Sequence, residues 1–110
     1  LLASNNANSR NAHLCKAAAK YISRNYTEEI TLNELAEQFY ISPNYLGTLF
    51  KKNMGMGIKE YQTAIRLEQA EALIASGKFK LYQVAQMVGY SNYEYFRKIY
   101  FKHKSRNPSE

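Results

Sequence analysis

An internal repeat constrains this chain more than any other feature. The segment 34–52 (ELAEQFYISPNYLGTLFKK) parallels the segment 83–102 (QVAQMVGYSNYEYFRKIYFK), with one extra residue in the second turn. Each copy is typical of a short helix, a tight turn and a longer helix, which is the helix-turn-helix arrangement. Small Ala36 and Ala85 let the two helices of each copy cross closely, while Ile41 and Tyr90 fill the turns. The fold must therefore hold two such units.

Helical periods and end signals dominate the rest of the chain. Thr31, Ser42 and Asn92 stand where helix N-caps belong, and Pro43 suits a first helical position. Apolar residues recur at helical spacing over about 58–76, and Gly77 closes that long segment. A further helix is expected over about 11–25, with one apolar stripe formed by Leu14, Ala17, Ala18, Tyr21 and Ile22. Strand signals are scarce, so the sequence predicts an all-α fold of about seven helices, the last opening at Pro108.

These elements predict four parts along the chain. Residues 1–10 are rich in Asn and Ser and are expected to be a flexible linker or a cloning remnant. Residues 11–56 form a first helix-turn-helix subdomain, 57–76 a long linker helix and 77–110 a second helix-turn-helix subdomain. At 1.5 Å per residue, the linker helix is expected to span about 28 Å.

Composition limits the kinds of binding partner and excludes several classes of protein. A net charge of +6 favours a polyanion such as nucleic acid. The single cysteine permits no disulfide within the chain, and the two histidines lack acidic or cysteine partners for catalysis or metal binding. No run is long and apolar enough for a membrane helix. We expect a cytoplasmic protein that is not an enzyme, with no cofactor, metal or membrane contact.

The two copies resemble the DNA-binding domain of the AraC/XylS family of bacterial transcription regulators. The resemblance rests on LAEQFYISPNYLGTLFKKNMGMGIKEY, RLEQAEALI, LYQVAQMVGYSNYEYFRKIY and NPSE, and it covers about residues 11–110. Two departures are visible. Ser105 stands where the family usually has Gly, and Tyr100 and Phe101 stand where it usually has Phe and Lys.

The resemblance implies sequence-specific binding of double-stranded promoter DNA by two recognition helices in successive major grooves. It also implies a transcription factor, with activation as the expected role, RNA polymerase as a partner and an N-terminal sensor or receiver domain that this chain lacks. The helical period turns outward Pro43, Asn44, Gly47, Thr48 and Lys51 in the first copy, and Tyr93, Glu94, Arg97, Lys98 and Phe101 in the second. Of these, the resemblance implies that Asn44, Gly47, Thr48, Glu94, Arg97 and Lys98 read bases. The expected DNA-backbone contacts are Ser42, Lys51, Lys52, Asn92, Tyr93, Lys102 and Lys104.

Several alternatives stay open on sequence alone. Glu94 could accept from cytosine, repel phosphate or orient Arg97. Ten tyrosines could stack on single strands, although five of them fall on predicted core stripes. Those five are Tyr21, Tyr61, Tyr90, Tyr95 and Tyr100. Arg66 is expected to form a structural bond or ion pair within the protein rather than to contact DNA. The rival function is a helical protein–protein interaction module that does not bind DNA, in which Gly47 permits close helix approach.

Overall fold

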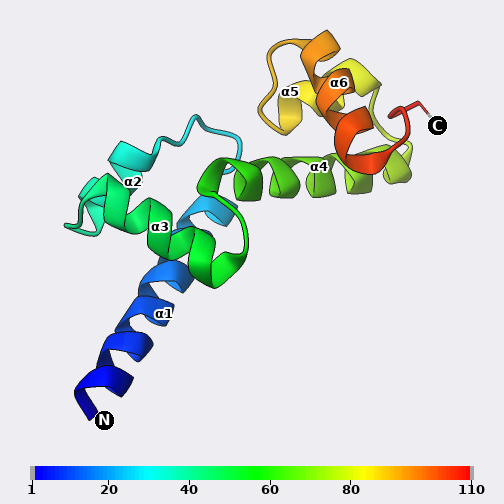
Figure 1. The fold of residues 1–110 in the computed structure, drawn as a ribbon. Coiled ribbons are helices and arrows are strands. Elements are labelled where there is room, and N and C mark those ends of the chain that lie inside the picture. The colour runs from blue at the N-terminus through cyan, green and yellow to red at the C-terminus, as the bar shows by residue number, and fades with distance from the viewer. Residues whose placement is uncertain (1, 110) are drawn as a thin grey trace. The chain divides into compact units, whose positions relative to one another are not determined.

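Six helices make up the part of the chain that the structure describes, residues 2–109 of a computed structural model, with side chains from residue 9 onward (Figure 1). Those residues contain no strand, so the predicted all-α fold is confirmed. The helices are α1 (Leu2–Arg24), α2 (Leu32–Gln38), α3 (Pro43–Met54), α4 (Ile58–Ser76), α5 (Leu81–Met87) and α6 (Tyr93–Lys104). None of them is long and apolar enough to cross a membrane.

The predicted helix caps are confirmed. In each cap a side-chain oxygen accepts a hydrogen bond from the backbone N–H three residues further on. The oxygens belong to Thr31, Ser42 and Asn92, with lengths of 3.1, 3.1 and 2.9 Å. Gly55 and Gly77 follow α3 and α4 in the left-handed conformation, which glycine adopts without steric penalty. Local sequence signals therefore set most helix boundaries.

The structure differs from two expectations at the chain ends. Residues 2–10, expected to be flexible, continue α1 back to Leu2. Once the packed part of a helix has nucleated, each further turn adds hydrogen bonds at little extra entropic cost, so Asn and Ser do not stop it. The seventh helix expected at Pro108 does not form within the described residues, where 108 and 109 make a turn and Pro108 is buried.

Backbone contacts divide the chain into two compact units. The first unit comprises residues 1–25 and 29–62, and the second comprises residues 26–28 and 63–110. The division therefore falls within α4, whereas the predicted parts begin and end with that helix. The short segment 26–28, which lies between α1 and α2 in sequence, belongs to the second unit.

The core of the first unit forms where α1 and α2 pack against α3. Leu46 and Phe50 of α3 are fully buried, and Leu49 is nearly so. The buried stripe of α1 runs through Cys15, Ala18, Ala19 and Ile22. This stripe does not include Ala17, which was expected to lie on it but is exposed. Burial raises the pKa of the Cys15 thiol, so this cysteine packs as a small apolar residue.

The core of the second unit is built around Phe96 of α6. Its ring lies 5.7 Å from that of Tyr90 and 5.8 Å from that of Tyr100, measured between centroids. Further buried residues come from α4 and from α5 with its following turn: Leu67, Ala70, Val84, Ala85 and Val88. Tyr90 and Tyr100 are buried as expected. Tyr95 was expected on this core stripe but is 53% exposed, because α6 turns that edge to solvent.

The turns of the two helix-turn-helix copies share one backbone design. Tyr40 and Gly89 each lie two residues past the end of the first helix and both have positive φ, 57° and 104°. The next residue donates its N–H to the carbonyl of Ala36 or Ala85, closing a Schellman motif in each copy. Glycine is the usual residue at this position. Tyr40 occupies it with its side chain 95% exposed.

Candidate nucleic-acid interface

The outward face of α3 carries three polar side chains. Asn44, Thr48 and Lys51 are exposed, because the opposite stripe of the helix is buried in the first unit. Ser42 caps the helix at the edge of this face. The N-terminal N–H groups of a helix and its positive end favour anions, so this end is suited to a phosphate. The face is small and weakly polar.

Gly47 lies at the flank of α3 and not at the centre of its outward face. A Cβ added there would lie 3.2 Å from Cδ2 of Leu32 in α2. Residue 47 is turned by about 100° from its neighbour Leu46, which points into the core, so it faces the adjacent helix. The missing side chain lets α2 and α3 approach each other. This contact between two helices of the same chain was not expected from the sequence, which placed Gly47 on the outward face.

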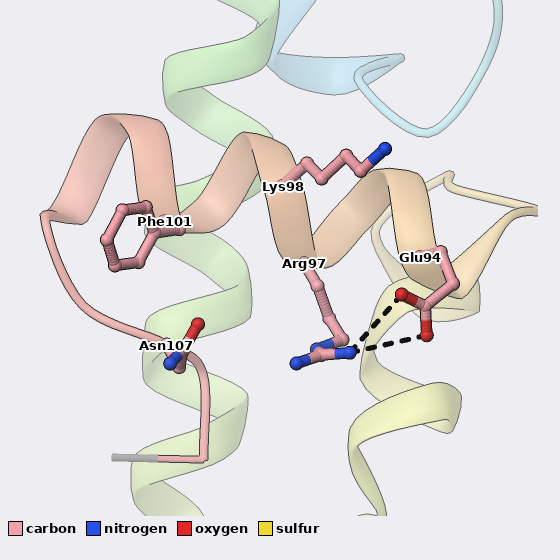
Figure 2. Close-up of a pocket in the computed structure, with 5 residues that line it drawn as sticks. All are labelled: Glu94, Arg97, Lys98, Phe101 and Asn107. Carbon is pink, nitrogen blue, oxygen red and sulfur yellow. Dashed lines mark hydrogen bonds and ion pairs between the residues drawn. The ribbon is translucent and has the colours of Figure 1, made fainter.

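The outward face of α6 carries an ion pair. Nη1 of Arg97 lies 3.2 and 3.3 Å from the two carboxylate oxygens of Glu94, one helical turn earlier (Figure 2). The guanidinium also lies 6.0 Å from the centre of the Tyr93 ring. Of the three roles considered for Glu94, this geometry favours orientation of Arg97. The pair is exposed, so it contributes little to stability.

An open hollow of about 410 Å³ lies along this face of α6. Figure 2 shows its lining: Glu94, Arg97, Lys98, Phe101 and Asn107. Lys98 and Arg97 extend to different sides of the helix (Figure 2), so the two cations do not compete for one position. Phe101 is 53% exposed on this face, as its place in the helical period predicts. A charged and aromatic surface of this kind suits base edges and thymine methyl groups.

The other predicted backbone contacts differ in accessibility. Lys52, Asn92 and Lys102 are exposed, and Tyr93 is half-buried under Arg97. Lys104 is half-buried, and its Nζ lies 3.3 Å from Oε1 of Glu71 in α4. Among the expected DNA contacts on α6, Lys104 is therefore already paired within the protein. The sequence gives no sign of this pair, because its partners are 33 positions apart.

Arg66 has a structural role, as expected. Its Nε donates to the carbonyl of Tyr26 at 2.6 Å, and Nη2 donates to the carbonyl of Glu28 at 3.1 Å. The guanidinium also lies 4.9 Å from the centre of the Tyr90 ring. Burial raises the pKa of Tyr90, and Arg66 opposes that rise without cancelling it. Arg66 thus fastens the segment 26–28 to α4 and to the turn before α6.

No group of three or more His, Cys, Asp or Glu side chains within the described residues is placed to hold a metal ion. The candidate site consists of the outward faces of α3 and α6, with their caps and nearby lysines.

Comparison with known families identifies this arrangement. A family model described as a helix-turn-helix domain matches residues 35–110, which covers both copies except for Glu34. A chain that is 38% identical over 102 residues is an uncharacterized helix-turn-helix-type transcriptional regulator, YijO, of Escherichia coli K12. The C-terminal domain of AraT, a response regulator from Geobacillus stearothermophilus, superposes with a TM-score of 0.82 at 29% identity. The chain belongs to the AraC-type helix-turn-helix family. The matched relatives are transcriptional regulators.

The extent of these matches differs between relatives and solved domains. The YijO match covers 93% of this chain and 36% of the relative. The lactose operon transcription activator of Staphylococcus xylosus is 34% identical, with 84% of this chain and 33% of the relative covered. The AraT domain match covers 87% of this chain and 80% of that chain. The chain thus spans about a third of the length of these curated relatives but most of the solved domain.

Proposed function

We propose that this chain reads double-stranded promoter DNA through α3 and α6, which enter successive segments of the major groove. The observation that carries the proposal is the repeated design: each copy buries one stripe of its second helix and exposes the opposite, polar face. Because the two reading helices, α3 (the first reader) and α6 (the second reader), differ in sequence and belong to one chain, the bound site has two unlike halves. A symmetric dimeric reader would instead bind a palindrome.

The two readers contribute different contacts under this proposal. Arg97 and Lys98 supply strong polar contacts, with guanine as the preferred partner, while Glu94 holds Arg97 in place. In α3, Asn44 pairs with adenine and Thr48 contacts a thymine methyl group. Gly47 allows close approach of the backbone and carries no side-chain information. Ser42, Asn92, Lys51, Lys52, Lys102 and Tyr93 contact the DNA backbone.

We further propose that the intact regulator activates transcription in the bacterial cytoplasm. Support comes from the relatives, which include a lactose operon transcription activator and a response regulator. In this proposal an N-terminal sensor or receiver domain controls the DNA-binding domain, and RNA polymerase is the protein partner at the promoter.

Selection of bound sequences from a pool of random duplexes tests this function. We expect an asymmetric motif with two boxes whose centres are about one helical turn, or about 10 base pairs, apart. Affinity for the selected duplex should fall steeply with salt, because several phosphates are neutralised. A palindromic motif would contradict the arrangement of two readers on one chain. Salt-insensitive binding, or no enrichment, would favour the protein-interaction module instead.

Substitution of Arg97 tests the assignment of base contacts in α6. Arg97→Ala should weaken binding to the selected duplex by about 1–3 kcal/mol and relax the preference at one base pair. Lys102→Ala serves as the control, because Lys102 is an exposed lysine of α6 that is expected to contact phosphate only. The affinity that Lys102→Ala loses should be similar on selected and random duplexes. Equal losses on both duplexes for Arg97→Ala would reduce Arg97 to a phosphate contact.

A further inference from the structure

One carboxylate in the second unit holds two cations. Oε1 of Glu71 lies 3.3 Å from Nζ of Lys104, and Oε2 binds Nη2 of Arg106. Glu71 lies on α4, whereas both cations lie at the C-terminal end of α6 or just beyond it. Lys104 and Arg106 lie 33 and 35 positions after Glu71 in the sequence, so these contacts are a feature of the tertiary structure alone.

The backbone after α6 is shaped to make this double contact possible. Ser105 adopts the left-handed conformation at φ 57° and turns the chain back, so that Arg106 returns toward α4. Pro108 is buried in the same region, beside a hollow lined by Glu71, Tyr100 and Arg106. Lys104 and Arg106 are therefore held on the α4 side of α6.

The equivalent end of α3 has no such arrangement among the described residues. Lys51 and Lys52 occupy its last turn, and both are exposed. No carboxylate of the described chain forms an ion pair with either of them. The two readers thus have different local charge, although each ends in basic residues.

An ion pair changes what a cation contributes to DNA affinity. Much of that affinity comes from counterions released when a protein cation neutralises a phosphate. A lysine or arginine that is already paired with a carboxylate must break that pair before it can act in this way. While the pair holds, the charge of that cation contributes little to phosphate neutralisation, whichever sequence the duplex carries.

We propose that Glu71 keeps Lys104 and Arg106 away from DNA phosphates and thereby limits sequence-independent binding by the second reader. The inference rests on the proposed function, since it concerns the same DNA-binding face. Base contacts by Arg97 and Lys98 then form a larger share of the affinity of the second unit. In this role Glu71 acts on specificity without touching DNA.

A pair of matched substitutions on α4 tests the inference. Glu71→Gln and Glu68→Gln remove the same charge from the same helix, but Glu68 is exposed and forms no ion pair with either cation. We would measure the affinity of each variant for a random-sequence duplex over a range of salt. Each released cation that meets a phosphate should steepen the salt slope by about 0.9. Between about 50 and 200 mM salt this is an extra loss of about 3.5-fold per cation.

A second pair of substitutions makes the test independent of the stability of the Glu71 variant. Lys104→Gln should leave the salt slope of the otherwise unchanged chain as it is, because Lys104 is already paired. Lys102→Gln should reduce that slope by about 0.9, because Lys102 is exposed and available. Combined with Glu71→Gln, the Lys104→Gln change should remove part of the added slope.

The outcomes separate this inference from the proposed function. If the unchanged chain binds no duplex, the proposed function itself fails. If the unchanged chain binds duplex, equal salt slopes for Glu71→Gln and Glu68→Gln overturn the inference. Glu71 would then have only a structural role. A reduced slope for Lys104→Gln alone also overturns the inference, because Lys104 would then contact phosphate despite Glu71.

Discussion

Replacement of Gly89 by alanine should damage the second unit severely. Gly89 forms the turn between α5 and α6, with φ at 104°. A Cβ added there would lie 2.8 Å from the carbonyl oxygen of Thr27 and 3.0 Å from Cζ of Arg66. The oxygen belongs to the backbone, and Arg66 is held by two carbonyls of the same segment. Neither neighbour can move without loss of those bonds.

The magnitude follows from two costs and one gain. A left-handed conformation disfavours an L-residue by about 1–2 kcal/mol. Forcing a methyl group into a packed site adds about 1–3 kcal/mol. Alanine lowers the conformational entropy of the unfolded chain, which offsets about 0.4–1 kcal/mol of these costs. The free energy of unfolding should therefore fall by about 2–4 kcal/mol. For a unit of this size the melting temperature should drop by at least about 8 °C.

Tyr40→Ala provides the matched control in the first unit. Tyr40 occupies the equivalent left-handed position, but its side chain is 95% exposed and already carries a Cβ. Its replacement should change stability by no more than about 0.5 kcal/mol.

Thermal unfolding followed by circular dichroism gives the size of each effect, and amide hydrogen exchange locates it. For Gly89→Ala, lost protection should concentrate in α5, α6 and the segment 26–28. If Gly89→Ala unfolds at the same temperature as the Tyr40→Ala control, the predicted clash with the Thr27 carbonyl is absent in solution.

Two further substitutions test single features of the fold. Ser105→Gly should raise the free energy of unfolding by about 1 kcal/mol, because Ser105 is exposed and holds a left-handed φ of 57°. A lower melting temperature for this variant would show that the serine side chain compensates for its backbone strain. Leu46→Ala should reduce stability by about 2–5 kcal/mol, because the side chain is fully buried between the helices of the first unit. An unchanged denaturant midpoint would place Leu46 outside the core.

Patterns within single helices could be predicted from the sequence because they depend on neighbours a few positions apart. The caps at Thr31, Ser42 and Asn92 are bonds to the residue three positions on, so each is encoded locally. The same period identified the exposed faces of α3 and α6. The buried stripe of α1 differs from the expected one, since a run of alanines has no strong polar face. Cys15 and Ala19 are buried there, whereas Ala17 is exposed.

Sequence by itself thus determined the repeat, the helix ends and the two outward faces, because helical geometry fixes which side chains share a face. Only the tertiary structure decided what lies beside those faces. Gly47 meets Leu32, and Lys104 meets Glu71. Arg66 binds carbonyls of the segment 26–28, 38 and 40 positions away. Such pairs depend on how helices pack across the core, and residues that far apart leave no local pattern in the chain.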